Sequence, residues 1–374
     1  MIMNIAIIGA GNMGTAIAAD LARNNNVKIH TSKPHLFNGL LKYVDIETGD
    51  SFESRISLAS DNVEDVLKDV EIAFVTVPTQ VISETVEKMR PYISTATSVG
   101  FVPGAGGVDF LSVPLIAKGC CVFGFERVPY VARLKEYGRA VSASKKSKYR
   151  VAVFPKNRKD GLAKKISILF DRPCAEMKSF LSMTLTPTLH TSRLYDLYAN
   201  YKEGDILPDN PYFYGDWRDS ASEICLKLDD ELHEVTDALE IAGIDVSELV
   251  PYRIHYESPD VKALTNKLRT IASLNKIKGP VIENSDGTFS LDLDSRYFTE
   301  SFPFRLAIVK GLAELIGKEV PKTTTVLKWY ASLKYKEYFI NDQFIGKDTK
   351  ECNIPQNKGI NTLHALIEFY SPVN

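Results

Sequence analysis

The sequence predicts a two-domain protein of mixed class, in which a doubly wound parallel α/β domain is followed by an all-α domain. Three observations predict this. Apolar strand-like runs alternate with helical patterns over the first half, 3.6-residue apolar stripes fill the second half, and the change falls near residue 184. Because 374 residues can bury two cores, we assign residues 1–183 to the first domain and 184–374 to the second.

Composition excludes several classes of protein. Hydrophobic residues make up 44% of the chain, charged residues 25%, and the formal net charge is −2, so we expect no nucleic-acid partner. No apolar run reaches the roughly 18–20 residues of a membrane span. The five cysteines form no C-x-x-C pair, and no basic region precedes the first strand. We therefore expect a cytoplasmic protein without a metal site, which acts on small molecules, and the sequence leaves a homo-oligomer open.

The stretch "NIAIIGAGNMG", residues 4–14, joins an apolar strand to an alanine-rich helix. Its glycines have the G-x-G-x-x-G spacing of a Rossmann dinucleotide-binding unit. The first permits the turn, the second lets the backbone approach a pyrophosphate, and the third lets the helix pack on the strand. The helix N-terminus then offers N–H groups to the phosphates. The expected pyrophosphate site comprises Gly9, Gly11, Asn12, Met13 and Gly14.

The end of the second strand bears on the choice of dinucleotide. NAD-selective sites usually carry an Asp or Glu about 20 residues after the glycine motif, which binds the ribose 2′-hydroxyl. Here the strand ends "HTSK", with no carboxylate. Thr31, Ser32 and Lys33 suit a 2′-phosphate, which favours NADP. The alternative is that Lys33 is an ordinary surface lysine and that NAD is accepted.

Further strands are expected within residues 70–78, 95–107, 120–125 and 149–155, with a helical pattern at 158–170. Pro78 stands where a proline can open a helix, which we expect to run to Met89. Ligands of doubly wound sheets bind beyond the carboxyl ends of the strands. The loops 9–14, 78–80 and 102–107 are therefore expected to border one crevice, and Pro78 joins the expected cofactor site.

The second half shows helical stripes and no strand pattern of comparable strength. Gly243 is the expected C′ residue of the first long helix, and Ser258 and Pro259 are the expected N-cap and N1 residues of the next. The expected helices span 219–243, 258–274, 303–317 and 323–333.

The stretch "TLTPTLHTSRLYDLY", residues 184–198, contains one of only six histidines, His190. By position alone, a histidine at a domain edge is more readily a structural hydrogen-bonding residue. If a helix starts there, its first turn would aim into an interdomain cleft. A neutral imidazole there can donate to a carbonyl or an imine nitrogen while hydride arrives at the carbon.

The whole chain resembles the octopine/nopaline (opine) dehydrogenase family. The family pattern N-P-x-x-H-P falls on the region of His190, and the resemblance implies that this residue is the catalytic acid/base. Thr186 and Thr191 replace the family's Asn and second Pro. The resembling stretches are "IIGAGNMG" at 7–14, "ERVPYVARLKEYG" at 126–138, "TPTLHTSRLY" at 186–195, "YESPDVKALTNKLRTIASLNKIKGP" at 256–280 and "SRYFTESFPFRLAIVKGLAEL" at 295–315.

One departure concerns the partner of the histidine. The family usually has Thr-Glu-Asp where this chain has "TES", and its aspartate is taken to orient the imidazole. Ser301 stands in that place and can hydrogen-bond to an imidazole, but it cannot stabilise an imidazolium by charge. Arg305, where glycine is common in the family, either binds a substrate carboxylate or lies in solvent.

The resemblance also implies a substrate-binding role for residues 126–138. Glu126 would hold a substrate amine and Arg133 a keto-acid carboxylate. Family members that use arginine often carry a cysteine before this arginine. The equivalent residue here is Ala132, which argues against arginine as the substrate.

The resemblance implies an NADPH-dependent opine-type dehydrogenase, which condenses an α-keto acid with the amine of an amino acid or amino compound and reduces the imine. Two alternatives stay open. One is a simple 2-keto-acid or sugar-acid reductase with the same two domains. The other is a non-catalytic NADP-binding sensor or scaffold protein, which Ser301 would favour.

Overall fold

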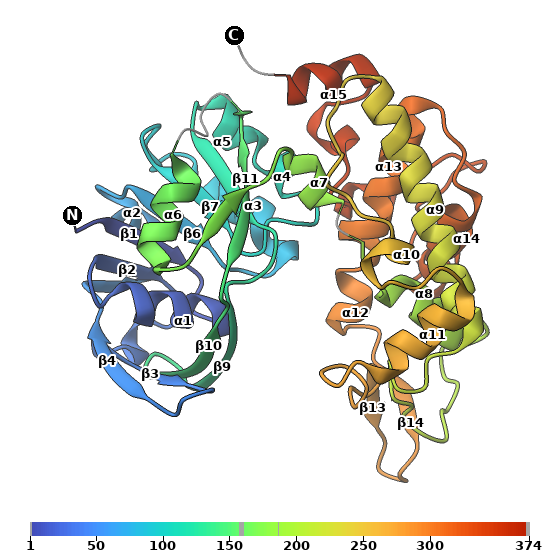
Figure 1. Ribbon diagram of the computed structural model, residues 1–374, viewed down its shortest axis with the longest axis horizontal. Coiled ribbons are helices and arrows are strands. Elements are labelled where there is room, and N and C mark those ends of the chain that lie inside the picture. Colours follow the sequence, from blue (N-terminus) through green and yellow to red (C-terminus); the bar gives the residue numbers. More distant parts are fainter. Residues whose placement is uncertain (1, 157–160, 186, 372–374) are drawn as a thin grey trace. The chain divides into compact units, whose positions relative to one another are not determined.

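The computed structural model describes residues 2–156, 161–185 and 187–371, and the chain divides into two compact units (Figure 1). The first unit contains the residues up to Thr184 together with Tyr370 and Ser371, and the second is Leu185–Phe369. The sequence suggested no return of the chain to the first unit. The helical unit is therefore an insertion between Thr184 and Tyr370.

The first unit is built on an eight-stranded sheet of order β12-β11-β8-β7-β6-β1-β2-β5. It is parallel from β5 to β8, which confirms the Rossmann-type α/β class. β11 pairs antiparallel with β8, so the expectation of an entirely parallel sheet is wrong at this edge. The strands are β1 (Asn4–Ile8), β2 (Asn26–His30), β5 (Leu58–Ser60), β6 (Ile72–Val75), β7 (Ser98–Phe101), β8 (Cys121–Phe125), β11 (Tyr149–Phe154) and β12 (Cys174–Glu176).

The reversal at β11 has a topological cause. A parallel neighbour needs a crossover connection, usually through a helix. Between β8 and β11 the chain instead forms a hairpin of β9 (Tyr130–Glu136) and β10 (Ala140–Lys145). These strands join β3 (Leu40–Asp45) and β4 (Ser51–Arg55) in a second sheet, of order β4-β3-β10-β9, which the sequence analysis missed. This sheet curves around the first helix of the unit (Figure 1).

Helices cover the main sheet, and those expected after Pro78 and within 158–170 begin about four residues later than the sequence suggested. Pro78 precedes a 3₁₀ turn, Thr79–Val81, and the α-helix starts only at Ile82. The expected helix at 158–170 starts at Leu162, and residues 158–160 lie outside the described residues. The helices of this unit are α1 (Asn12–Leu21), α2 (Val63–Leu67), α3 (Ile82–Met89), α4 (Val108–Leu111), α5 (Val113–Ala117), α6 (Leu162–Phe170) and α7 (Phe180–Thr184).

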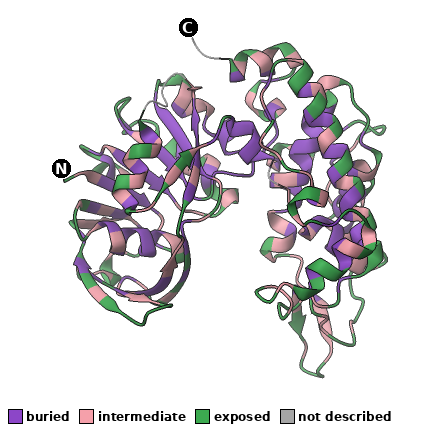
Figure 2. Ribbon diagram, viewed as in Figure 1, coloured by how far each residue is buried: buried purple, intermediate pink, exposed green. Residues whose placement is uncertain are grey.

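The core of the first unit lies on both faces of the central strands, which Figure 2 shows as buried. Strand β6, Ile72–Val75, is buried at every position. Parallel strands covered on both faces read as continuous apolar runs, which is why the sequence revealed them. The strands of the second sheet are buried at only some of their positions and follow no regular apolar pattern, and Val131 on β9 is 55% exposed.

The second unit is mainly helical, as expected. Gly243 ends the long helix α9 with a φ of +91°, which confirms it as the C′ residue. An antiparallel hairpin of β13 (Val281–Glu283) and β14 (Phe289–Leu291) was not expected. The helices are α8 (His190–Tyr198), α9 (Asp219–Ile241), α10 (Tyr252–His255), α11 (Val261–Thr270), α12 (Arg296–Thr299), α13 (Ala307–Ile316), α14 (Pro321–Leu333) and α15 (Leu363–Tyr370).

The start of α11 corrects one prediction. Ser258 is not its N-cap and Pro259 is not its N1 residue. Asp260 is the N-cap, and its carboxylate accepts a hydrogen bond of 2.9 Å from the backbone N–H of Ala263. Ser258 instead donates its hydroxyl to the carbonyl of Tyr256. Within the described ranges, no helix combines the length and apolarity needed to cross a membrane.

Candidate active site

The glycine turn after β1 is packed tightly on its inner side. Gly9 has a φ of +106°, a conformation that favours glycine. A Cβ atom on Gly14 would lie 1.9 Å from the carbonyl oxygen of Gly9, so the helix could not approach the turn with any other residue there. Thr76 donates its hydroxyl to the same carbonyl at 3.0 Å, which ties the turn to the end of β6.

Gly11 differs from its two neighbours in the motif. A Cβ atom added to it would meet no heavy atom within 4 Å. Gly11 is the N-cap of α1, and in the described structure no side chain caps this end and no acidic residue lies in the first turn. The free N–H groups and the positive end of the helix dipole therefore suit an anion that approaches over Gly11.

Asn12 and Met13 open α1 but contribute differently. The side-chain oxygen of Asn12 accepts a hydrogen bond of 2.7 Å from the backbone N–H of Leu134, and so ties the start of α1 to β9. Met13 packs against the core of the unit. Any contact of these two residues with a phosphate is therefore expected from their backbone.

The residues just after β2 include a buried hydroxyl, on Thr31, and an exposed cation, on Lys33. Thr31 is 4% exposed, and its hydroxyl lies 2.6 Å from the hydroxyl of Tyr137 and accepts from the backbone N–H of Lys33 at 3.1 Å. Ser32 and Lys33 are exposed, and the Lys33 ammonium lies 5.7 Å from the centre of the Tyr137 ring. Thr31 therefore shapes the turn, and Ser32 and Lys33 are left to face a ligand.

Tyr137 is a residue that sequence reasoning missed. It lies in the turn between β9 and β10, more than one hundred residues after Thr31. Nothing in the strand pattern linked this turn to the end of β2. The one available signal was Gly138, a residue type common in turns.

The sheet order brings the expected loops together. β1, β6 and β7 are consecutive neighbours in the sheet and run parallel, so the loops that follow them lie at the same edge. Pro78 stands in the second of these loops. A Cβ atom on Gly9 would lie 2.9 Å from a side-chain methyl of Val77, so this loop directly adjoins the glycine turn.

The two residues expected to bind substrate in the first unit have different surroundings. Glu126 forms an ion pair of 2.9 Å with Arg150, a partner that sequence reasoning did not include. Arg133 is exposed on β9, and its guanidinium donates to the carbonyl of Ala132. The binding of an amine by Glu126 and of a carboxylate by Arg133 stays a prediction.

In the second unit, the structure brings together His190 and Ser301, which are 111 positions apart in the chain. His190 is the first residue of α8, and its Nδ1 lies 3.0 Å from the Ser301 hydroxyl oxygen. The ring of Tyr297 lies 4.5 Å from the imidazole, centre to centre, and that of Phe213 lies 5.9 Å away. Tyr297 is a further neighbour that sequence reasoning missed.

The electrostatic surroundings keep this imidazole neutral. Burial, reinforced by the positive charges of Arg305 and Arg296, lowers the pKa of His190 to about 4. Glu300 does not turn toward the histidine, because both its oxygens bind Arg296, at 2.8 and 2.9 Å. Ser301 is 3% exposed.

Arg305 lies in the segment Phe302–Leu306, which is wound as a π-helix. The N–H of Leu306 donates to the carbonyl of Ser301 at 3.2 Å, so the wide turn begins at the partner of the histidine. Such turns occur often at functional sites. Burial lowers the pKa of the Arg305 guanidinium, and the Glu300 carboxylate acts against this. Arg305 is thus a partly buried cation near His190, and not a solvated surface residue.

Two further residues complete the comparison with the family pattern. Thr186 lies outside the described residues. Thr191, in place of the family's second proline, is 3% exposed within α8.

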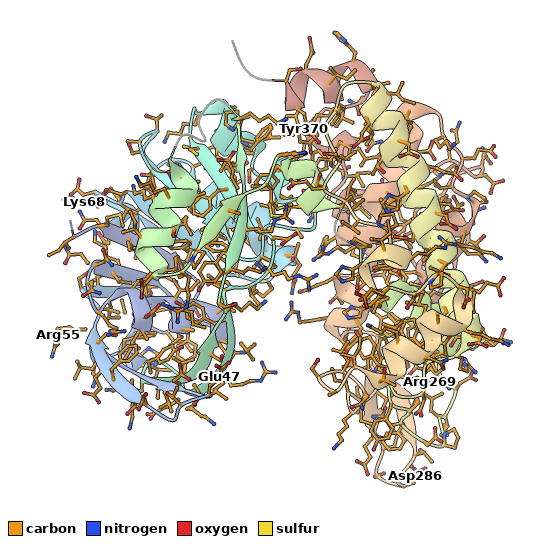
Figure 3. The ribbon with its side chains drawn as sticks, viewed as in Figure 1. Glu47, Arg55, Lys68, Arg269, Asp286 and Tyr370 are labelled. Atoms are coloured by element: carbon orange, nitrogen blue, oxygen red, sulfur yellow. The ribbon has the colours of Figure 1, made fainter. Side chains whose placement is uncertain are left out.

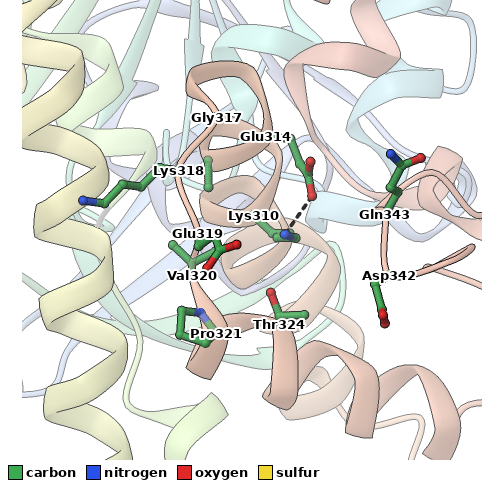
Figure 4. A pocket seen from close by; sticks show the side chains of 11 residues that line it. Lys310, Glu314, Gly317, Lys318, Glu319, Val320, Pro321, Thr324, Asp342 and Gln343 are labelled. Carbon is green, nitrogen blue, oxygen red and sulfur yellow. Dashed lines mark ion pairs between the residues drawn. The ribbon is translucent and has the colours of Figure 1, made fainter.

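The helical unit also has a surface pocket of about 480 Å³ between the end of α13 and the start of α14 (Figure 4). It contains none of the expected site residues. Lys310 in its wall is paired with Glu314 at 2.7 Å, and Lys318 with Glu234 at 3.1 Å, so both of its lysines are paired within the protein. Its walls are formed by Lys310, Ala313, Glu314, Gly317, Lys318, Glu319, Val320, Pro321, Thr324, Asp342 and Gln343.

Comparison with known proteins matches two segments of the chain to known domains. Residues 176–334 match the α-helical domain of NAD/NADP octopine/nopaline dehydrogenase. Residues 4–108 match the N-terminus of NAD-dependent glycerol-3-phosphate dehydrogenase, which identifies the first unit as an NAD(P)-binding domain.

Similarity also extends over whole chains. Tauropine dehydrogenase of Arabella iricolor is 25% identical, over 97% of this chain and 99% of its own. A solved octopine dehydrogenase with NADH and L-arginine superposes with a TM-score of 0.86 at 23% identity, over 98% of this chain and 97% of its own. A yersinopine dehydrogenase with NADP⁺ bound gives a TM-score of 0.67 at 12% identity, over 96% and 99%. The matched domains and the end-to-end similarity confirm the resemblance seen in the sequence: residues 176–334 carry the α-helical domain of octopine/nopaline dehydrogenases, and the chain is similar to opine dehydrogenases over nearly its whole length.

Proposed function

We propose that the protein is an NAD(P)H-dependent opine-type dehydrogenase. It condenses an α-keto acid with the amine of an amino acid or amino compound, and reduces the imine to a secondary amine. The observation that carries this proposal is the partly buried His190–Ser301 pair, in a chain whose other unit has a glycine turn that is open at Gly11. Relatives named tauropine and octopine dehydrogenase, one of them solved with NADH and L-arginine, support the same reaction.

The roles of the two units follow from their residues. In this proposal residues 1–183 hold the cofactor and residues 184–374 supply the acid/base group. The cofactor, when bound, supplies hydride from C4 of its nicotinamide. The backbone around Gly9, Gly11 and Gly14 holds its pyrophosphate.

His190 acts in this proposal as a neutral hydrogen-bond donor. A pKa of about 4 leaves the imidazole uncharged at neutral pH. When the Ser301 hydroxyl donates to Nδ1, the ring proton is placed on Nε2, where it can polarise a carbonyl or an imine nitrogen. Serine can thus set this tautomer by donating to Nδ1, whereas the family's aspartate could only accept from an Nδ1–H, and serine adds no negative charge.

Arg305 is proposed to neutralise a substrate carboxylate. An arginine binds a carboxylate through two parallel hydrogen bonds, which fixes the orientation of the acid as well as its charge. Arg305 lies close enough to His190 to influence its pKa, which suits a carboxylate that is attached to the reacting carbon. Arg133 is the corresponding candidate in the first unit.

We further propose a preference for NADP. Ser32 and Lys33 are exposed at the end of β2, and Tyr137 lies under the Lys33 side chain. No carboxylate stands at positions 30–33 to bind a ribose 2′-hydroxyl. Structurally similar dehydrogenases have been solved with NADH and with NADP⁺, so the fold accommodates either cofactor.

The decisive experiment follows the oxidation of NADPH and of NADH against a matrix of α-keto acids and amines, with product masses determined. Oxidation that requires both substrates and yields the mass of a secondary amine supports the proposal. Full-rate oxidation with the keto acid alone would identify a simple keto-acid reductase instead. Cofactor binding without any turnover would identify a non-catalytic sensor. We propose a cytoplasmic location and small molecules as partners, and sedimentation would establish whether the chain self-associates.

A further inference from the structure

Asp109 is a buried carboxylate that the proposed reaction does not use. It lies in α4, two residues after the glycine-rich loop 102–107, and is 0% exposed. Its Oδ1 accepts hydrogen bonds from the Thr184 hydroxyl at 2.8 Å and from the backbone N–H of Phe110 at 3.1 Å. Its Oδ2 accepts from the Tyr370 hydroxyl. Tyr370, labelled in Figure 3, is the last residue of α15.

The two side-chain partners of Asp109 lie where the chain leaves and re-enters the first unit. Thr184 is the last residue of the first unit before the chain enters the helical unit, and Tyr370 is the first residue after it returns. One carboxylate therefore holds both points at which the chain passes between the units. The hydrogen bond to Tyr370 joins residues 261 positions apart.

The surroundings of this contact are apolar and closely packed. Thr184 is 1% exposed, and the Tyr370 ring packs edge-on against Phe154 and Phe110, with ring centres 5.7 and 6.3 Å away. Burial raises the pKa of Asp109 to about 6, and the hydrogen bonds from Tyr370 and Thr184 act against this. A carboxylate in such a place costs stability that an apolar side chain would not, and buried polar groups of this kind can specify one arrangement of a chain.

We propose that Asp109 is a positioning residue of the reaction, which pins both interdomain connections to one point of the cofactor-binding unit. The inference rests on the proposed function. The glycine turn belongs to one unit and His190 to the other, so the rate of hydride transfer depends on how the connections hold the two units. Asp109 acts through Thr184 and Tyr370 and touches neither substrate nor cofactor.

The test removes one hydroxyl at a time. Thr184→Val and Tyr370→Phe each delete a donor and keep the shape of the side chain. We expect each variant to lose about ten-fold or more in kcat, because small misplacements of reacting groups have effects of this size. The NADPH dissociation constant, measured by fluorescence, should stay within about two-fold, because the glycine turn is intact.

Two matched variants control for the loss of a buried hydrogen bond. Tyr338→Phe deletes a tyrosine hydroxyl that donates to Glu351 at 2.6 Å, and Thr97→Val deletes a threonine hydroxyl that donates to the Val70 carbonyl at 2.6 Å. Neither residue lies at a connection between the units. Both controls should lose similar stability but keep kcat within about two-fold. If the controls lose as much kcat as Thr184→Val and Tyr370→Phe, the proposal is wrong.

A second readout does not need the substrates. Small-angle X-ray scattering of the free protein should show a broader distribution of distances for Tyr370→Phe than for Tyr338→Phe, and amide exchange should rise in residues 180–185 and 366–371. Unchanged scattering and exchange would overturn the proposal even if the enzyme is active. A wild-type protein with no opine activity would overturn the proposed function but leave this readout valid. Asp109→Asn, which can still accept one bond and donate the other, should retain more kcat than Asp109→Leu.

Discussion

The imidazole Nδ1 of His190 lies 3.0 Å from the hydroxyl oxygen of Ser301, so the two residues form a partly buried pair without a carboxylate. In the family pattern an aspartate stands in the place of this serine. The pair can therefore set the tautomer of the ring, but a positive charge on the imidazole would have no countercharge from residue 301. The His190 imidazole is therefore expected to act as a neutral hydrogen-bond donor.

Removal of the serine hydroxyl tests this arrangement. Ser301→Ala should lower kcat by about ten-fold to one hundred-fold, because the tautomer is no longer set. Ser301→Asp should raise the pKa of His190 above about 4, as measured by NMR titration, because a carboxylate favours the charged ring. Ser290→Ala, which deletes a hydroxyl bonded to Asn284 on the hairpin, is the control. An unchanged kcat in Ser301→Ala would show that the serine does not position the ring.

The lowered pKa of His190 also predicts how stability depends on pH. The folded protein binds the proton at about pH 4 and the unfolded chain at about 6.5, so the contribution of His190 is fully present above pH 6.5 and is lost as pH falls toward 4. The loss is at most about 3 kcal/mol, from 2.5 pKa units at ~1.36 kcal/mol each. Denaturant unfolding at several pH values should show a shallower slope for His190→Gln. His364→Gln, at an exposed histidine, should behave as the wild type does.

The cofactor preference can be reversed at one position. Lys33→Glu should raise the KM for NADPH about ten-fold or more and leave the KM for NADH equal or lower, because a carboxylate repels a 2′-phosphate and accepts from a 2′-hydroxyl. Tyr137→Phe should raise the KM for NADPH less, since Thr31 loses its hydroxyl partner. Lys68→Glu makes the same charge change at another exposed site of this unit and should alter neither value. If Lys33→Glu changes the KM for NADPH and the KM for NADH by the same factor, Lys33 does not bind a 2′-phosphate.

The glycines of the motif should respond differently to the same substitution. Gly14→Ala places a methyl group 1.9 Å from the Gly9 carbonyl oxygen, so we expect misfolding or a large loss of stability. Gly11→Ala meets no protein atom within 4 Å and should fold with a free energy of unfolding within about 0.5 kcal/mol of the wild type. Its NADPH dissociation constant should nevertheless rise about ten-fold or more, because the methyl group occupies the approach of the pyrophosphate. Thermal unfolding and cofactor titration together separate these outcomes.

The sequence predicted the parts of the fold whose information is local. The glycine turn, the buried strands around it and the end of α9 at Gly243 each depend on a few adjacent residues. The start of α11 was misplaced by two residues because Ser258, Pro259 and Asp260 are all good residues for a helix start. Only the observed hydrogen bond from Ala263 selects the aspartate.

The contacts that join distant segments could not be predicted in the same way. The second sheet pairs β3 with β10, about one hundred residues later, and its strands lack a clean apolar alternation. Tyr137 reaches Thr31 only because of that sheet. The pairing of His190 with Ser301 was anticipated through the family resemblance, since neither spacing nor composition links the two positions.

The hydrogen bond between Asp109 and Tyr370 has a consequence for biosynthesis. The ribosome incorporates Asp109 long before Tyr370, its last hydrogen-bond donor, because Tyr370 follows it by 261 residues. The nucleotide-binding unit therefore emerges with a carboxylate that lacks one donor, and it completes its interior only after the inserted helices have been translated. Premature termination before Tyr370 would leave the Asp109 carboxylate buried in α4 without its tyrosine donor, in a unit that is otherwise complete.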